Sequence, residues 1–241
     1  LDWTILRPGL VLSPHAYGGT SLLRMLGAFP LIQPVTMGTA RIQIVSVDDV
    51  AGAVLRVLEG GLERQDFDLL SDDTHTLEAL ILKMRKWLGF AAPHAVMRFP
   101  EWMGGLTARL ADIAGWLGWR AALRTTALTV LTSNIMGDRA RWRDATGMPL
   151  KSLDETLKQM PSTAQERVYA RAMLVFPLLV VLLSRLWIAS GVIGLIQHDA
   201  AMQVLNGRMG HTLASICVRG GALVDIAIGC AIVFRPTLRI G

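Results

Sequence analysis

Four residues near the start of the chain, Pro8, Gly9, Leu10 and Val11, form a turn that could hold a flat ligand. They follow residues 1–7, an apolar run with the pattern of a buried strand. In open α/β sheets ligands bind beyond the carboxyl ends of the strands. A glycine at that point lets the backbone approach a planar ring closely. The alternative is a structural turn, in which Pro8 only ends the strand.

Two charged residues, Arg185 and Asp225, lie near the middles of two long apolar segments, residues 172–196 and 213–234. A lone charge at the centre of a bilayer costs about 2.5 kcal/mol or more on insertion scales. In an antiparallel hairpin both residues reach a similar depth, so we expect them to form an intramembrane ion pair. The alternative is separate solvation, in a water-filled cavity or by further helices.

The other residues that could take part in chemistry are better explained by structural roles. Asp48 and Asp49 stand where a helix is expected to begin, and acidic residues there cap free N–H groups and stabilise the helix dipole. The histidines show no metal-ligand spacing. Cys217 and Cys230 lie in one apolar segment, roughly 20 Å apart on a helix, which is too far for a disulfide. We assign no catalytic residue and no metal site.

The composition changes sharply along the 241 residues. From residue 172 onward there are five Arg and two acidic residues, and most of the rest is apolar. Two such stretches can each cross a hydrocarbon core of about 30 Å, whereas the alternative is a buried helix of a soluble bundle. We predict a transmembrane hairpin. Four cations flank it, which places both termini and the soluble part in the cytoplasm by the positive-inside rule: Arg167, Arg171, Arg235 and Arg239.

The net charge of +5 does not indicate a nucleic-acid partner, because the cations are scattered rather than clustered on one face. Upstream of the apolar part, strand patterns over residues 3–7, 41–47 and 67–71 alternate with helical patterns over residues 48–59 and 76–88. This alternation predicts the α/β class, a partial Rossmann-type doubly wound sheet. Because the first strand begins at residue 1, we expect the front half of the sheet to lie outside this sequence.

Residues 100–165 predict a helical subdomain and a linker. The pattern from 100 to 136 is helical, residues 138–150 predict a polar loop, and Ser152 with Glu155 has the spacing of a capping box that starts a short helix. Three tryptophans are expected to pack in the core of this subdomain, with a membrane-interface belt as the alternative: Trp102, Trp116 and Trp119.

Residues 1–11 (LDWTILRPGLV) and 44–51 (IVSVDDVA) resemble two markers of extended and atypical short-chain dehydrogenases/reductases, the NAD-dependent epimerase/dehydratase group. The resemblance covers about the first ninety residues. It implies NAD or NADP as cofactor, with backbone around Pro8, Gly9, Leu10 and Val11 facing the nicotinamide amide. Residues 43–45 resemble the atypical branch related to the 39 kDa-type accessory subunit of respiratory complex I.

The sequence departs from the pattern of this family in two respects, one that concerns the substrate and one that concerns catalysis. Arg41 lies one position off the substrate-phosphate Arg of sugar-nucleotide epimerases, and Ser46 stands where they usually have His, which argues against a sugar-nucleotide substrate. The sequence also lacks a Gly-rich phosphate fingerprint and the Tyr-x-x-x-Lys motif, since Tyr17 and Tyr169 are its only tyrosines and no Lys follows at that spacing. We therefore expect no hydride transfer by this chain alone, and cofactor binding only in the intact protein.

Residues 169–192 and 220–229 resemble two helices of the DoxX-like membrane domain that is found fused behind such dehydrogenases. That domain normally has four helices, so we expect it to be truncated here. The predicted organisation is a Rossmann-like portion at residues 1–99, the helical subdomain and linker at 100–165, and the membrane domain at 166–241.

Together these expectations describe part of an oxidoreductase anchored in the inner or plasma membrane. Its partners would be the lipid bilayer and a hydrophobic small-molecule substrate drawn from it. The alternative is a non-catalytic dinucleotide-binding scaffold or assembly factor of a membrane complex, and a third option is a small membrane redox partner. No oligomeric state follows from the sequence.

Overall fold

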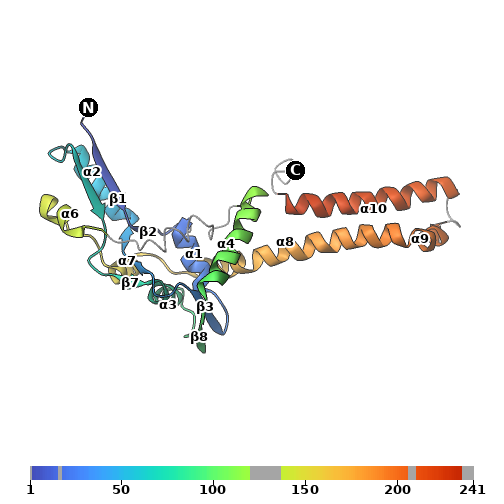
Figure 1. The fold of residues 1–241 in the computed structure, drawn as a ribbon, viewed down its shortest axis with the longest axis horizontal. Coiled ribbons are helices and arrows are strands. Elements are labelled where there is room, and N and C mark those ends of the chain that lie inside the picture. Colours follow the sequence, from blue (N-terminus) through green and yellow to red (C-terminus); the bar gives the residue numbers. More distant parts are fainter. Residues whose placement is uncertain (1, 16–17, 120–136, 206–209, 235–241) are drawn as a thin grey trace. The chain divides into compact units, whose positions relative to one another are not determined.

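The computed structural model describes residues 2–15, 18–119, 137–205 and 210–234 (Figure 1). The chain divides into two compact units. The first comprises Leu1–Asp112 and Ala121–Leu174, and the second comprises Ile113–Arg120 and Val175–Gly241.

The first unit is built on parallel strand pairs. β1 (Thr4–Pro8) pairs with β6 (Gln65–Leu69), and β2 (Leu10–Leu12) pairs with β5 (Ile44–Ser46). Parallel strands need crossover connections. Here α1 (Gly18–Gly27) lies between β2 and β5 in the chain and α2 (Val47–Leu58) between β5 and β6. This is a partial Rossmann-like arrangement, which confirms the predicted α/β class.

Two further strand pairs belong to this unit, and of their four strands only residues 41–42 fall within a predicted strand. β3 (Ile32–Thr36) pairs in parallel with β8 (Ala95–Phe99), and β4 (Arg41–Ile42) pairs antiparallel with β7 (His75–Thr76). β3 carries Pro34, which weakens a strand pattern because proline lacks the N–H that a ladder needs. The predicted strand over 41–47 is divided at Gln43, because its two halves pair with different partners.

Several helices of the first unit begin at polar caps. The Ser46 hydroxyl accepts from Asp48 N at the start of α2, and the Thr76 hydroxyl accepts from Ala79 N at the start of α3 (Leu77–Trp87). Both helices agree with prediction to within one residue at each end. Ser152 and Glu155 form the reciprocal capping box of α7 (Leu153–Gln159), which confirms the predicted short helix.

Two buried clusters form the core of this unit. The larger one joins residues of α1, α3 and α7 to β2, β3, β4 and β5. The smaller one is built around Phe67 of β6: Val45, Ala53, Leu62, Phe67, Leu69 and Trp142. β1 and β2 together contribute to both, because Leu6 and Val11 pack against the smaller cluster and Leu12 belongs to the larger.

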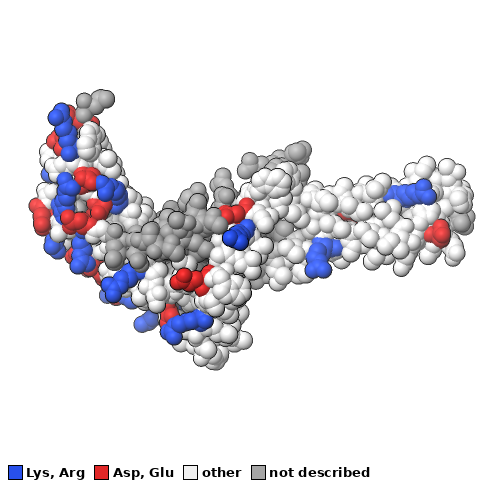
Figure 2. All heavy atoms as spheres, in the orientation of Figure 1, with Lys and Arg blue, Asp and Glu red and all other residues white. Residues whose placement is uncertain are grey.

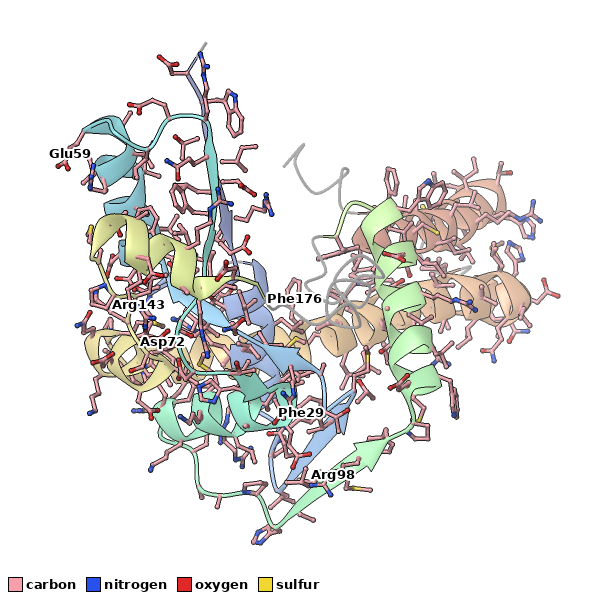
Figure 3. The ribbon with its side chains drawn as sticks, turned by 60° about the vertical axis from the view of Figure 1, so that its left-hand side comes forward. Phe29, Glu59, Asp72, Arg98, Arg143 and Phe176 are labelled. Carbon is pink, nitrogen blue, oxygen red and sulfur yellow. The ribbon has the colours of Figure 1, made fainter. Side chains whose placement is uncertain are left out.

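The prediction of a polar loop over residues 138–150 is wrong. Residues Arg139–Thr146 form α6, which is capped by the Asp138 side chain at its start and ends at Gly147 with φ +69°. Trp142 turns inward and is 1% exposed. Arg143 lies toward Asp72, 3.6 Å between Nη1 and Oδ2, and helps to bind α6 to the segment after β6 (Figure 3).

The expectation that the tryptophans of the helical segment pack in a core is wrong for two of them. α4 (Glu101–Trp116) is helical as predicted, but Trp102 is 68% exposed and Trp116 is 82% exposed. The rest of the predicted helical stretch, residues 120–136, lies outside the described residues.

Among the described residues, two helices are long and apolar enough to cross a membrane, α8 (Ala164–Ile196) and α10 (His211–Val233). A short helix, α9 (His198–Leu205), lies between them in the chain. Of the residues in their most apolar windows, only 6% and 11% are buried. Figure 2 shows Lys, Arg, Asp and Glu crowded over the first unit, whereas the visible surface of the two long helices is mostly uncharged.

Candidate functional site

The candidate segment lies where the chain changes strand partner. Gly9 N donates to Leu69 O of β6 at 3.1 Å, and the next amide, Leu10 N, donates to Gln43 O at 3.1 Å, next to β5. The chain therefore leaves the pair of β1 with β6 after Pro8 and joins the pair of β2 with β5 at Leu10, with Gly9 between the two strands. In open α/β sheets ligands bind beyond the carboxyl ends of the strands, and both β1 and β6 end here, at Pro8 and Leu69.

Gly9 also has a packing reason to be glycine. A Cβ at this position would lie 2.5 Å from Leu70 Cδ2 and 2.6 Å from Gln43 O, and the second atom belongs to the backbone. The glycine is therefore required by the crossing of the two strand pairs, whether or not a ligand approaches it. Pro8, by contrast, has an exposed side chain.

Gln43 ties together the segments around Gly9. Its buried side chain donates from Nε2 to Ser71 O at 3.1 Å and accepts at Oε1 from Gly137 N at 3.3 Å. Ser71 N in turn donates to Ile44 O, 2.8 Å. Residues far apart in sequence thus fix the backbone beside the candidate segment.

The loop after β2 is held by a buried arginine. Arg24 Nη2 donates to Ser13 O at 3.2 Å and to Pro14 O at 2.8 Å, and its guanidinium lies 4.8 Å from the Trp87 ring centroid. Burial lowers the pKa of Arg24, while Glu166 and Tyr169 act in the opposite direction. Pro8, Gly9, Leu10 and Val11 carry no titratable side chain. This segment can therefore present a binding surface but supplies no acid or base.

Asp48 and Asp49 have different structural roles. Asp48 is exposed in the first turn of α2. Asp49 Oδ2 accepts from Lys151 N at 2.9 Å, and Lys151 Nζ lies 3.7 Å from Asp49 Oδ1. Asp49 therefore links α2 to the segment just before α7, and the cap of α2 comes from Ser46.

A polar cluster that sequence reasoning missed surrounds Asp73. Asp73 Oδ2 bonds His75 Nε2 and accepts from Leu153 N, 3.2 Å, at the start of α7. Burial acts to raise the pKa of Asp73, but the hydrogen bonds from His75, Ser71 and Leu153 outweigh it and leave the pKa below its ordinary value. The close spacing of Ser71, Asp73 and His75 is the only signal in the sequence. The contact of Asp73 with Leu153 N fixes the start of α7.

The structure does not bring Arg185 and Asp225 together. Asp225 Oδ2 instead accepts from the Ser190 hydroxyl at 2.8 Å, and no ion pair joins Arg185 to Asp225 within the described part of the chain. Arg185 is exposed on α8. Ser190 is the partner of Asp225 that sequence reasoning missed.

Small residues bring α8 and α10 into close contact. The buried Ser184 hydroxyl donates to Gly229 O at 2.8 Å. A Cβ at Gly229 would lie 2.6 Å from Ile188 Cγ1, and one at Gly191 would meet Ala222 O. Small residues at such positions let helix backbones approach closely in membranes.

One shallow cavity of about 460 Å³ lies against the first turns of α10. It is lined by His211, Thr212, Ser215, Ile216, Arg219 and Gly220. His198 Nε2 lies 3.2 Å from the Ser215 hydroxyl. Among the described residues, no group of three or more His, Cys, Asp or Glu side chains could hold a metal ion.

No protein-family model matches the chain, and no curated protein matches it. Similar solved structures include UDP-glucose 4-epimerase of Thermotoga maritima with UDP-glucose, at 21% identity over 72% of this chain and 47% of that one, TM-score 0.44. RMD of Pseudomonas aeruginosa complexed with NADPH is 16% identical over 68% of this chain and 48% of that one, TM-score 0.44. UDP-glucose 4-epimerase of Thermus thermophilus complexed with NAD is 16% identical over 71% and 47%, TM-score 0.43.

The chain spans about half the length of each of these structures. At these TM-scores the likeness carries no argument of its own, and the fold assignment rests on the strand pairings described above.

Proposed function

We propose that this chain is part of a membrane-anchored NAD(P)-binding oxidoreductase of the short-chain dehydrogenase/reductase type. The observation that carries the proposal is the change of strand partner at Gly9, which sets the Pro8, Gly9, Leu10 and Val11 backbone at the divergence of two parallel pairs. A nicotinamide ring would lie against this segment. Hydride transfer itself would depend on residues of the intact protein beyond this sequence.

The membrane part of the proposal rests on the exposed surface of α8 and α10. From residue 175, α8 extends for about 33 Å, and α10 for about 35 Å, and both exceed a hydrocarbon core of about 30 Å. Their large apolar side chains point outward, including Leu179, Leu186 and Leu223. Water-soluble monomers rarely expose apolar patches of more than a few hundred Å². The hairpin, which resembles a DoxX-like domain, would anchor the first unit at the cytoplasmic face, where a hydrophobic substrate could enter from the bilayer.

The test uses the longest natural open reading frame that contains this sequence, purified in nanodiscs and titrated with NADH and NADPH. Binding is followed by energy transfer from tryptophan to the reduced nicotinamide. Gly9 is unsuitable for substitution, because a side chain there meets the backbone of Gln43. Pro8→Ala removes an exposed ring from the candidate segment, and Pro100→Ala removes another exposed proline, ahead of α4, as the matched control.

We expect Pro8→Ala to weaken nucleotide binding several-fold with an unchanged melting temperature, and Pro100→Ala to have no effect. Absence of binding to the unsubstituted protein overturns the proposal. If the protein binds NADH or NADPH tightly but oxidises neither of them, the result favours the alternative, a non-catalytic scaffold or assembly factor.

A further inference from the structure

The surface of α4 has the reverse of the pattern expected for a helix of a soluble domain. Its small residues face protein: Gly104 and Ala108 are buried, and a Cβ at Gly104 would lie 3.0 Å from Thr36 Oγ1 of β3. Its large apolar residues face outward. These exposed residues recur at intervals of three and four and therefore share one face of the helix; they are Trp102, Leu106, Leu110, Ile113 and Trp116. We call this set the α4 stripe.

The end of α4 is fixed to the residues that follow it. Trp119 N donates to Ala114 O at 2.9 Å and Gly118 N donates to Gly115 O at 3.0 Å, with Gly118 at φ +88°. This is the Schellman pattern, which closes a helix and holds the next residue in place. The backbone of Trp119 is therefore set by the last turn of α4.

The side chain of Trp119 in turn contacts both long helices, at the last residue of α10 and at Phe176 of α8. Its Nε1 donates to Val233 O, the last residue of α10, at 2.7 Å. Its ring meets the ring of Phe176 of α8 edge-on, with centroids 5.6 Å apart. Phe176 is labelled in Figure 3. The last turn of α4, with Ile113 and Trp116, is consequently held beside the end of α10 and beside Phe176 of α8, within the second unit.

We propose that α4 is an interfacial helix whose stripe inserts into the surface of a lipid bilayer. Three observations favour lipid over a protein partner. The last turn of the stripe, with Ile113 and Trp116, belongs to the second unit together with the exposed apolar residues of α8 and α10. Tryptophan stands at both ends of the stripe, and this residue is enriched at membrane–water interfaces. The nearest charge on that face, Arg109, is exposed and long enough to reach the headgroups.

This inference rests on the proposed membrane hairpin, so the experiment must separate the two. A background with Cys217→Ser and Cys230→Ser receives one new cysteine at a time, labelled with an environment-sensitive fluorophore. Ile113→Cys and Leu106→Cys report on the stripe, and Thr107→Cys reports on an exposed position of α4 away from it. Leu179→Cys on α8 reports on the hairpin itself.

Each labelled protein is placed in phosphatidylcholine nanodiscs with and without brominated acyl chains. We expect brominated chains to quench the Ile113 and Leu106 labels about as strongly as the Leu179 label, and to leave the Thr107 label unchanged. If only the Leu179 label is quenched, the hairpin proposal stands and the α4 inference is overturned. If the stripe labels are shielded from aqueous iodide without bromine quenching, a protein or a second copy covers the stripe, and the inference is overturned as well.

A Leu179 label that remains unquenched would overturn the hairpin proposal and with it this inference.

A second measurement avoids new cysteines altogether. Trp102→Phe and Trp116→Phe should each reduce the share of intrinsic fluorescence that brominated chains quench, whereas Trp142→Phe, in the core of the first unit, should not. Equal effects of the three substitutions would also overturn the inference.

Discussion

The ring of Trp142 on α6 meets the ring of Phe67 on β6 edge-on, with centroids 5.5 Å apart and planes at 83°. The two side chains are each 1% exposed and form the centre of the smaller core cluster. Because this contact lies beneath a surface that is otherwise held by ion pairs such as Arg141 with Asp66, 2.8 Å, it is the main apolar anchor of α6.

Trp142→Ala should therefore destabilise the first unit by about 3–5 kcal/mol, since it removes a large buried ring and leaves a cavity. Trp142→Phe should cost much less. It keeps an aromatic contact with Phe67 and removes an indole N–H that has no hydrogen-bond partner among the described residues. Urea unfolding followed by circular dichroism measures both. Equal losses for the two variants would show that packing against Phe67 is not what holds α6.

The position of α6 shows where sequence reasoning fails. Over α2 and α3 the apolar residues recur at helical spacing and polar caps mark the starts, so both helices were predictable. Arg139–Thr146 is only eight residues long and has one large apolar side chain, so no periodicity can appear. Asp138 and Gly147, a cap and a stop, were the available signals.

The candidate site, too, was predictable from the sequence only in part. The location of the turn at Pro8 and Gly9 follows from local pattern, but the contact of Gly9 with Gln43 joins residues that are far apart in the chain. For α8 and α10, the length of the apolar segment predicts where a residue lies along the helix axis but not how the helix is rotated about that axis. Arg185 and Ser190 are five residues apart and so lie about 140° apart around α8, and it is Ser190 that faces Asp225.

Asp73 should make the stability of the first unit depend on pH. Its folded pKa is lower than its unfolded value near 3.9, because the hydrogen bonds from His75, Ser71 and Leu153 favour the carboxylate despite burial. A depressed pKa contributes stability above the unfolded value, and this contribution is lost as the pH falls through the folded value. At pH 7, Asp73→Asn should cost about 1 kcal/mol, and the difference from the unsubstituted protein should shrink below about pH 4.

Urea unfolding of both proteins between pH 3 and pH 7 measures this difference. Asp144→Asn is the control, because Asp144 is exposed and its nearest cation, Arg143, lies 3.9 Å away at the surface. A difference that stays constant over the whole pH range would contradict the role given to the Asp73 carboxylate.

Gly229 should be indispensable to the packing of α8 against α10. A Cβ there would lie 2.6 Å from Ile188 Cγ1 and 2.9 Å from Ser184 O, so Gly229→Ala forces the helices apart and should destabilise by about 1–3 kcal/mol. At Gly220 a Cβ would meet nothing within 4 Å. Gly220→Ala should be neutral or stabilise by up to about 1 kcal/mol, because alanine favours helix. Thermal loss of helicity in detergent distinguishes the two, and similar behaviour would contradict the close contact.

Double-mutant cycles should identify the partner of Asp225. Ser190 donates to its carboxylate, whereas Arg185 lies on another face of α8. We therefore expect Ser190→Ala and Asp225→Asn to be coupled by about 0.5–1 kcal/mol, the usual size for polar contacts between membrane helices. Arg185→Leu and Asp225→Leu should instead be additive in the same thermal unfolding assay in detergent. If the arginine cycle shows the larger coupling, the ion pair expected from sequence forms in the membrane and the serine contact is secondary.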